Sequence, residues 1–348
     1  MLHRWIIRRS FVLGAAAAVL PIRLVRAQAP HAPEKSRLRI AVGMQAAFSN
    51  LPLTIADRLG YFTAEGVEVE LLDLANAQRA QQAVTEGAAD VAACAFDGLF
   101  EVQARKHPLR AFALLSRAPQ VAFGVAARHQ PAIRSVAELR GRKLAIAAPG
   151  ASARLVAALV LAREGLALDD VQLVESGGIG ATLLALRAGQ VDAVVHTEPV
   201  ISLLEQKGDI GLVADTRSLK GTQQLFGGLV PATTLLAAEQ SVPVLASRLQ
   251  ASTNAVVRAL KWLQTAGPSD LIRAVPEAHL LGDRGLYLAA FTKLRESIAL
   301  DGVIPEDGVR TMLRALQRVE PAVLAGKVEL ERLYTNEFAR KAKDRFRA

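Results

Sequence analysis

The chain has 348 residues, of which 51% are hydrophobic and 22% charged, with 42 lysines and arginines against 33 aspartates and glutamates. This is enough apolar material to bury one large core or two medium ones. The basic residues form no stripe of lysine and arginine interleaved with aromatic residues, which argues against nucleic-acid binding. Cys94 is the only cysteine, so a disulfide bond within the chain is excluded.

The first 29 residues predict an export signal that is removed from the mature protein. Cationic residues precede an apolar run at 11–20, and the segment ends in a small-x-small triplet, so we expect cleavage near Ala29 and a periplasmic location. The Arg8-Arg9 pair resembles a twin-arginine signal, with an ordinary Sec signal as the alternative. The apolar run is too short to anchor the chain in a membrane.

The charge of the mature chain is much smaller than that of the precursor. The signal contains five basic residues and no acidic one, so 37 basic residues remain against 33 acidic ones, a net charge of +4. A mild positive charge favours anionic small molecules or surfaces and predicts little more.

Strand and helix patterns alternate along the first part of the mature chain. Short apolar runs predict strands at 38–44, 67–73, 89–95 and 109–115. Helical patterns with end signals lie between them, at 51–62, 77–87 and 98–106. Such alternation through short links predicts a parallel sheet with helices on both faces.

The same alternation restarts at residue 143 and predicts a second α/β unit. Its strands are expected at 143–149, 170–176, 191–197 and 210–214, and its helices at 151–165, 179–189 and 198–208. From about residue 237 onward the pattern is mostly helical, beginning with a long periodic segment at 242–267. We expect these C-terminal helices to pack on the first unit.

One motif occurs in both units. "EGAADVAACAFD" (86–97) and "AGQVDAVVHTEP" (188–199) each contain a glycine, two residues, an aspartate and a short apolar run. The glycine suits the left-handed residue that ends a helix, and the aspartate suits a strand start where a carboxylate accepts from backbone amides. We interpret both as structural residues.

The ends of these two strands are candidate ligand-binding positions. In open parallel sheets ligands bind beyond the carboxyl ends of the strands. This rule selects Phe96 and Asp97 in the first unit and His196, Thr197 and Glu198 in the second. If the two ends face each other, they form a cleft between two lobes.

Two other loops contribute candidate contacts. Phe48 and Ser49 follow the first strand, where an aromatic ring either stacks on a ligand or packs within the loop. Gly150, Ala151 and Ser152 open the helix after the strand at 143–149, where free amides and the helix dipole favour an anion. Ser152 is alternatively only a helix cap.

Four stretches together resemble a known family. They are "LRIAVGMQAAFSNLPLTIADRLGYFTAEGVEVEL", "EGAADVAA", "VAELRGRKLAIAAPGASARLVAALVLAREGL" and "LRAGQVDAVVHTEPV". The chain is similar to the NMT1-like, SsuA/TauA-type substrate-binding proteins of ABC importers, a branch associated with nitrate, sulfonate, taurine and thiamine-precursor uptake. No single stretch would be specific enough alone.

The resemblance implies a two-lobed periplasmic-binding-protein type II fold in which ligand is trapped by hinge closure. We expect lobe one at 36–122 and 232–348, lobe two at 123–231, and crossings near 120–126 and 228–235. The implied function is capture of a small polar or anionic molecule, sulfonate-like or pyrimidine-like, for delivery to an ABC permease in the inner membrane. We expect a monomer that binds no nucleic acid.

The alternative function is an enzyme of the pyrimidine-precursor synthase type, which resembles these proteins. Such enzymes carry a cysteine-rich motif, and this chain has one cysteine. His196 has no nucleophile placed beside it by the sequence, so we interpret it as a structural histidine. We therefore predict no catalytic residue, cofactor or metal. Glu198 suits the first turn of a helix, or it faces the cleft and selects an amine or ring N–H of the ligand, as Asp97 would.

Overall fold

The computed structural model describes residues 36–103, 108–129, 133, 135–147, 152–175, 179–280, 282–324 and 328–348. The predicted export signal lies outside these residues. Within the described part of the chain, no helix is both long enough and apolar enough to cross a membrane.

Lobe one contains a five-stranded mixed sheet in the order β2-β1-β3-β10-β4. Its strands are β1 (Ser36–Gly43), β2 (Val67–Leu74), β3 (Val91–Ala95), β4 (Leu109–Leu114) and β10 (Thr233–Ala238). β1 pairs in parallel with β2 and β3, and β10 lies antiparallel between β3 and β4. The four strands predicted in the first unit are confirmed. The fifth strand, β10, follows the second unit in the sequence and returns to this sheet.

Lobe two contains a second sheet with the equivalent order β7-β6-β8-β5-β9. Its strands are β5 (Val121–Ala126), β6 (Lys143–Ile146), β7 (Gln172–Glu175), β8 (Ala193–Thr197) and β9 (Ile210–Asp215). β6 is parallel to β7 and β8, and β5 is antiparallel to β8 and β9. Each lobe therefore receives its antiparallel strand from the segment that follows the last parallel strand of the other lobe, a feature that alternation of elements does not predict.

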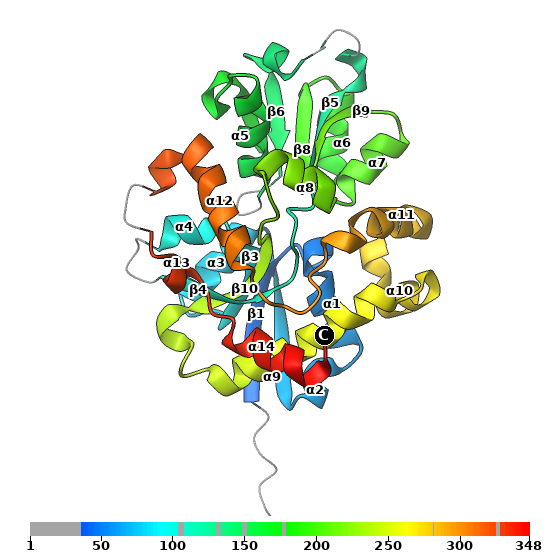
Figure 1. The fold of residues 1–348 in the computed structure, drawn as a ribbon. Helices are drawn as coiled ribbons and strands as arrows, with labels where there is room; N and C mark the ends of the chain where they lie inside the picture. The colour runs from blue at the N-terminus through cyan, green and yellow to red at the C-terminus, as the bar shows by residue number, and fades with distance from the viewer. Residues whose placement is uncertain are drawn as a thin grey trace, which may run out of the picture. The chain divides into compact units, whose positions relative to one another are not determined.

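Helices flank both sheets (Figure 1). Lobe one has α1 (Leu51–Arg58), α2 (Tyr61–Ala64), α3 (Ala77–Thr85) and α4 (Gly98–Val102). Lobe two has α5 (Ala153–Arg163), α6 (Ile179–Arg187), α7 (Val200–Gln206) and α8 (Leu219–Phe226). The cores behind them consist mainly of alanine, valine, leucine and isoleucine from both faces of each sheet.

The C-terminal helices pack mainly on lobe one. They are α9 (Ala246–Thr265), α10 (Pro268–Ala274), α11 (Arg284–Leu294), α12 (Glu306–Val319), α13 (Leu330–Leu333) and α14 (Glu337–Phe346). α9 contacts α1, α2, β1 and α14, and α14 also contacts β4, as expected from the sequence. In addition, α11 contacts α7, and α12 contacts α5 and α8, so this part of the chain also touches lobe two.

Two segments connect the sheets, and they are hydrogen-bonded to each other. The chain crosses between β4 and β5, just before the predicted segment 120–126, and returns between β9 and β10, in a stretch that contains most of the predicted 228–235. At the lobe-one end the Thr233 amide donates to Ser116 Oγ at 3.0 Å. At the lobe-two end the Thr216 amide and hydroxyl both donate to the Val121 carbonyl, at 2.8 and 2.6 Å. Gln120 between them has a φ of 58°, a strained value for a residue with a side chain.

The repeated motif has the same structural role in both lobes. Its two glycines have φ values of 77° and 74°, as helix-ending residues require. The Asp90 carboxylate accepts the backbone amide of Arg39 in β1 at 2.8 Å, and the Asp192 carboxylate accepts that of Lys143 in β6 at 3.0 Å. Each aspartate thus ties its strand to the neighbouring strand, which confirms the structural interpretation.

Gly43 is required where β1 ends against the start of α3. A Cβ at this position would lie 2.2 Å from the backbone nitrogen of Ala77, which no side-chain movement relieves. We expect Gly43→Ala to lower the free energy of unfolding by at least about 2 kcal/mol, as overpacked sites do. Urea denaturation measures the loss.

Gly180→Ala is the matched control, because a Cβ at Gly180 in α6 meets nothing within 4 Å. This variant should be stabilised by about 0.5–1 kcal/mol, since alanine is the better helix former. Equal stability of the two variants would contradict the described approach of β1 to α3.

Candidate functional site

A cavity lies where the strand ends of the two sheets meet. Its empty volume is about 610 Å³, open solvent at its mouth included. The described residues that line it come from both lobes and are Gly43, Met44, Ala47, Ser49, Asn50, Asn76, Ala77, Ala93, Cys94, Ala95, Pro119, Ala147, Ser152, Thr197 and Thr233. None of these described residues is charged or aromatic. The shared cleft expected from the sequence is therefore present at the carboxyl ends of β1, β3, β6 and β8.

Three helices begin at this cavity. Asn50 precedes α1, Asn76 and Ala77 open α3, and Ser152 precedes α5, and all four residues belong to the lining. The first amides of a helix have no partner within the helix and carry a partial positive charge. Asn76 caps α3 because its side chain accepts a hydrogen bond from the Arg79 amide at 2.9 Å. The amides of the first two residues of α3, at 77 and 78, have no partner within the helix. The start of α3 in lobe one and the start of α5 in lobe two thus border the cavity.

Ser152 makes a hydrogen bond across the lobes and does not cap its helix. Its hydroxyl donates to Asp97 Oδ1 at 2.9 Å, and its side chain accepts no amide of α5. The alternative that Ser152 is only a helix cap is therefore wrong. Asp97 follows β3 behind Ser152 and is not among the described lining residues. Burial raises the pKa of Asp97 to about 6, although the Ser152 hydrogen bond opposes this rise.

The two phenylalanines proposed as ligand contacts lie in the core. Phe48 is 2% exposed and stacks on Tyr287 of α11, with ring centroids 4.5 Å apart. Phe96 is fully buried and makes edge contacts with Phe100 and Tyr334. Neither belongs to the described lining, whereas Ser49, next to Phe48, does. The packed-loop alternative for Phe48 fits this placement.

His196 is a buried neutral side chain beside the cavity. It is 3% exposed, and its Nδ1 accepts the backbone amide of Thr197 at 2.9 Å. Burial lowers the pKa of His196 to about 4, so the ring is uncharged at neutral pH. Thr197 itself lines the cavity. The histidine therefore orients the strand end that carries a lining residue, in agreement with its interpretation as structural.

Glu198 points into lobe two and holds the start of α7. Its side chain is fully buried and accepts both the amide and the hydroxyl of Ser202, at 3.0 and 2.9 Å. It also accepts a hydrogen bond from Arg217 Nη1 at 2.6 Å. Glu198 lies two residues before α7, so it is not itself part of the first turn that one sequence interpretation gave it, but its carboxylate accepts an amide of that turn. Glu198 is not among the described lining residues.

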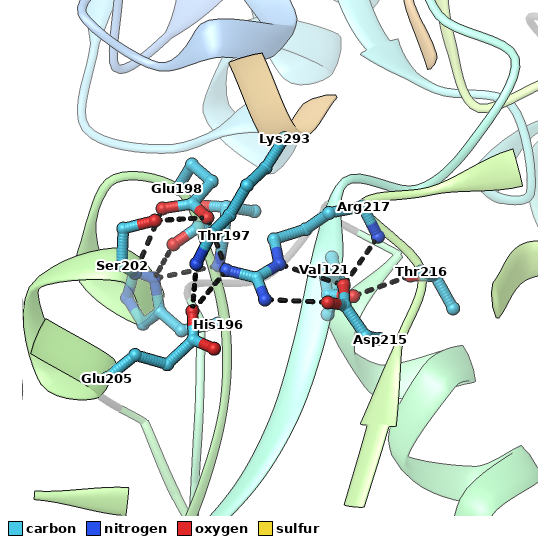
Figure 2. Close-up of polar contacts among 10 residues, drawn as sticks. All are labelled: Val121, His196, Thr197, Glu198, Ser202, Glu205, Asp215, Thr216, Arg217 and Lys293. Atoms are coloured by element: carbon cyan, nitrogen blue, oxygen red, sulfur yellow. Dashed lines mark hydrogen bonds and ion pairs between the residues drawn. The ribbon is translucent and has the colours of Figure 1, made fainter. Parts of the chain in front are cut away.

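Arg217 is the centre of a buried charge cluster in the second crossing (Figure 2). Its side chain is 2% exposed and forms a two-pronged ion pair with Asp215, with N–O distances of 2.8 and 2.6 Å, besides its contact with Glu198. It also contacts Glu205 at 2.7 Å, and Glu205 accepts Lys293 of α11 at 2.8 Å. Burial opposes the charge of Arg217, but the hydrogen bonds that it donates to Asp215 and Glu205 raise its pKa overall. The cluster connects the crossing, α7 of lobe two and α11.

Cys94 lines the cavity as an unreactive thiol. Burial raises its pKa to about 12, and its Sγ donates to the Ala77 carbonyl at 3.2 Å. A nucleophilic cysteine requires a lowered pKa and a basic partner. The environment of Cys94 gives it the opposite character.

Several lining residues were missed from the sequence. Asn76 had a usable signal, because it caps a predicted helix directly after a predicted strand. Asn50 ends a short 3-10 helix before α1, Pro119 lies in the first crossing, and Thr233 starts the antiparallel strand β10, so no sequence pattern placed them at the cleft. Gly150 and Ala151 lie outside the described residues.

Comparison with known proteins identifies similar chains. A family model described as NMT1/THI5 like matches residues 47–260. A solved structure from Bordetella bronchiseptica RB50 is 43% identical, covers 90% of this chain and 99% of its own, and has a TM-score of 0.85. None of the curated proteins compared with this sequence matches it.

Two solved binding proteins share the fold at low identity. The alkanesulfonate-binding protein SsuA from Xanthomonas axonopodis pv. citri, bound to MOPS, is 19% identical over 86% of this chain and 98% of its own, with a TM-score of 0.67. The nitrate-binding protein NrtA from Synechocystis PCC 6803 is 13% identical over 90% of this chain and 89% of its own, with a TM-score of 0.68.

The desulfurization enzyme DSZB is also similar, at 18% identity over 90% of this chain and 100% of its own, with a TM-score of 0.60. Likeness of fold alone therefore does not separate binding from catalysis.

Removal of the Arg217 charge should be strongly destabilising. Arg217→Met leaves the fully buried Glu198 carboxylate without its cation, and we expect the free energy of unfolding to fall by about 3–5 kcal/mol. Arg310→Met is the control, because Arg310 and Glu306 form an exposed pair within α12. It should leave the unfolding midpoint in urea unchanged. A loss for Arg217→Met no larger than that of the control would contradict the buried cluster.

Protonation of His196 should destabilise the protein in acid. The pKa of this group is lower in the folded state, about 4, than in the unfolded chain, about 6.5, so the unfolded state binds the proton first as pH falls. Between pH 6.5 and 4 the wild type should lose up to about 3 kcal/mol of stability that His196→Asn retains. Denaturation curves across this range measure the difference, and parallel pH profiles of the two proteins would refute it.

Proposed function

The chain belongs to the NMT1/THI5-like family and has the two-lobed α/β fold of periplasmic binding proteins, and we propose that it is an exported solute-binding protein of an ABC importer. The observation that carries this proposal is the cavity lined by strand ends and helix starts of both lobes. A ligand that contacts both lobes favours the closed arrangement by those contacts.

The preferred ligand is a small anion. The described lining is neutral, and α3 and α5 begin at it from opposite lobes. Convergent helix N-termini stabilise a negative charge without a positively charged side chain. The small size of the alanine-rich walls fits an aliphatic group beside the anionic one.

The lining favours a sulfonate-like ligand over a pyrimidine-like one. A flat heterocycle is usually held by aromatic side chains, and none of the described lining residues is aromatic. Phe48, the aromatic residue in the lobe-one loop, is already stacked on Tyr287. The similar SsuA protein from Xanthomonas axonopodis is an alkanesulfonate-binding protein, which agrees with this preference.

The lobe boundaries and the hinge are part of the proposal. We assign 36–122 and 232–348 to lobe one and 123–231 to lobe two. Hinge motion would take place in the two crossings, between the Ser116–Thr233 hydrogen bond at the lobe-one end and the Val121–Thr216 hydrogen bond at the lobe-two end. The protein would be exported by the signal at 1–29, act as a monomer in the periplasm, and deliver its ligand to a permease in the inner membrane.

The second candidate function is an enzyme on the same fold, favoured by the similarity to a desulfurization enzyme. Two observations weigh against it. Cys94 is held as a neutral thiol, and the ring of His196 is buried with its Nδ1 occupied by the Thr197 amide. These two residues therefore do not form a nucleophile and base pair.

A thermal-shift screen of the exported protein tests the proposed function. Alkanesulfonates, aminosulfonates, nitrate, carboxylates and pyrimidines would be compared, and a tight ligand raises the melting temperature by mass action. We expect a sulfonate to give the largest rise and to be recovered unaltered by mass spectrometry. Conversion of the compound into a product would favour the enzyme, and no shift with any compound would reject the proposal.

A carboxylate introduced at Asn76 should weaken anion binding. Asn76→Asp keeps a good helix cap but places a negative charge in the cavity lining, and Asn76→Ser keeps a neutral cap at the same position. We expect the first variant to lose at least about tenfold in affinity for the sulfonate found in the screen, and the second to lose much less. Calorimetric titration measures both, and equal affinities would place the anion elsewhere.

A further inference from the structure

A carboxylate of lobe one and a hydroxyl of lobe two meet at the edge of the cavity. Ser152 Oγ lies 2.9 Å from Asp97 Oδ1, and Ser152 is 4% exposed and lines the cavity. Asp97 follows β3, and Ser152 precedes α5. The bond therefore joins the two lobes beside the position of the ligand.

The direction of this hydrogen bond fixes the character of Ser152. An ionised carboxylate accepts hydrogen bonds and has no proton to give, so the single hydroxyl proton of Ser152 is directed to Asp97. The serine does not accept an amide of its own helix. What it offers to the cavity is its lone pairs, so it acts there as an acceptor.

Asp97 is mostly ionised at pH 7.5, although its surroundings raise its pKa overall. Burial raises its pKa to about 6, the bond from Ser152 lowers it, and the nearby negative charge of Glu320 raises it slightly. Glu320 is itself paired with Arg154 of α5 at 3.0 Å, which limits its effect on Asp97. A charged Asp97 behind Ser152 also disfavours a second negative group at this point of the cavity.

A second acceptor lies in the same lining. The side-chain amide of Asn50 donates to the carbonyls of Gly43 and Met44, each at 3.1 Å. Its side-chain oxygen can only accept hydrogen bonds, and Asn50 belongs to the lining.

We propose that Asp97 is a positioning residue that determines specificity: by taking the Ser152 proton it makes the cleft select an anion that also carries an N–H or O–H donor. This inference rests on the proposed function and concerns the same cavity. The anionic group lies at the start of α3, and the donor group contacts Ser152 and the side-chain oxygen of Asn50. Asp97 acts through Ser152 and does not itself touch the ligand.

Matched ligands test this role by calorimetric titration at pH 7.5. Ethanesulfonate has no donor, whereas 2-hydroxyethanesulfonate and 2-aminoethanesulfonate each add one at the same end. We expect the wild type to prefer the donor-bearing compounds by at least about tenfold, and Asp97→Ala to lose most of this preference because Ser152 then keeps a free proton. In the Ser152→Ala background, Asp97→Ala should change the preference no further.

The outcomes separate this inference from the proposed function. If none of the three compounds binds and the wider screen also finds no ligand, the proposed function fails. If they bind without a preference for the donor, or if Asp97→Ala still alters the preference in the absence of Ser152, the role of Asp97 is overturned while the binding function stands.

Carbon-13 NMR of the ligand-free protein provides a readout that does not depend on any ligand. We expect the pKa of the Asp97 carboxyl to rise in Ser152→Ala, because the hydrogen bond that lowers it is lost. Ser49→Ala is the control, since Ser49 also lines the cavity but makes no bond to Asp97. An unchanged Asp97 titration in Ser152→Ala would show that the bond is absent in solution and would overturn the proposal.

Discussion

The parallel pairing of β1 with β3 and of β6 with β8 is the constraint on which the cleft depends. Parallel strands end at the same edge of a sheet, and the helices that follow them begin there. Because both sheets have the same strand order, both lobes present the same kind of edge, with lining residues at the ends of β1, β3, β6 and β8. The exchange of β5 and β10 between the lobes then brings the two edges together through the two crossings.

The charged residues of the second crossing support the cleft from behind. Arg217 lies next to Thr216, which is bonded to Val121 at the start of β5, and it holds Glu198, which immediately follows the lining residue Thr197. Replacement of such a cluster by apolar residues is often tolerated, but removal of one partner is not. We interpret the cluster as the element that fixes where β8, α7 and the crossing meet, so that ligand contacts are made by neutral groups in front of it.

The α/β alternation, the two lobes and the role of the repeated motif followed from the sequence, because each depends on local periodicity and on residues with special backbone preferences. β5 and β10 did not, since antiparallel insertion depends on pairing partners that lie about a hundred residues away in the chain. Among the candidate contacts, Ser49, Ser152 and Thr197 do line the cavity. Phe48, Phe96, His196 and Glu198 turn into the protein, because a strand end alone does not reveal the direction of the next side chain.

Hydrogen exchange measured by mass spectrometry tests the central claim, that one small anion is held between both lobes. The exported protein would be compared with and without the sulfonate that stabilises it most. The account predicts added protection at the start of α3 in lobe one and, at the same ligand concentration, at the start of α5 and the end of β8 in lobe two. Protection confined to one lobe, or located away from these strand and helix ends, would contradict it.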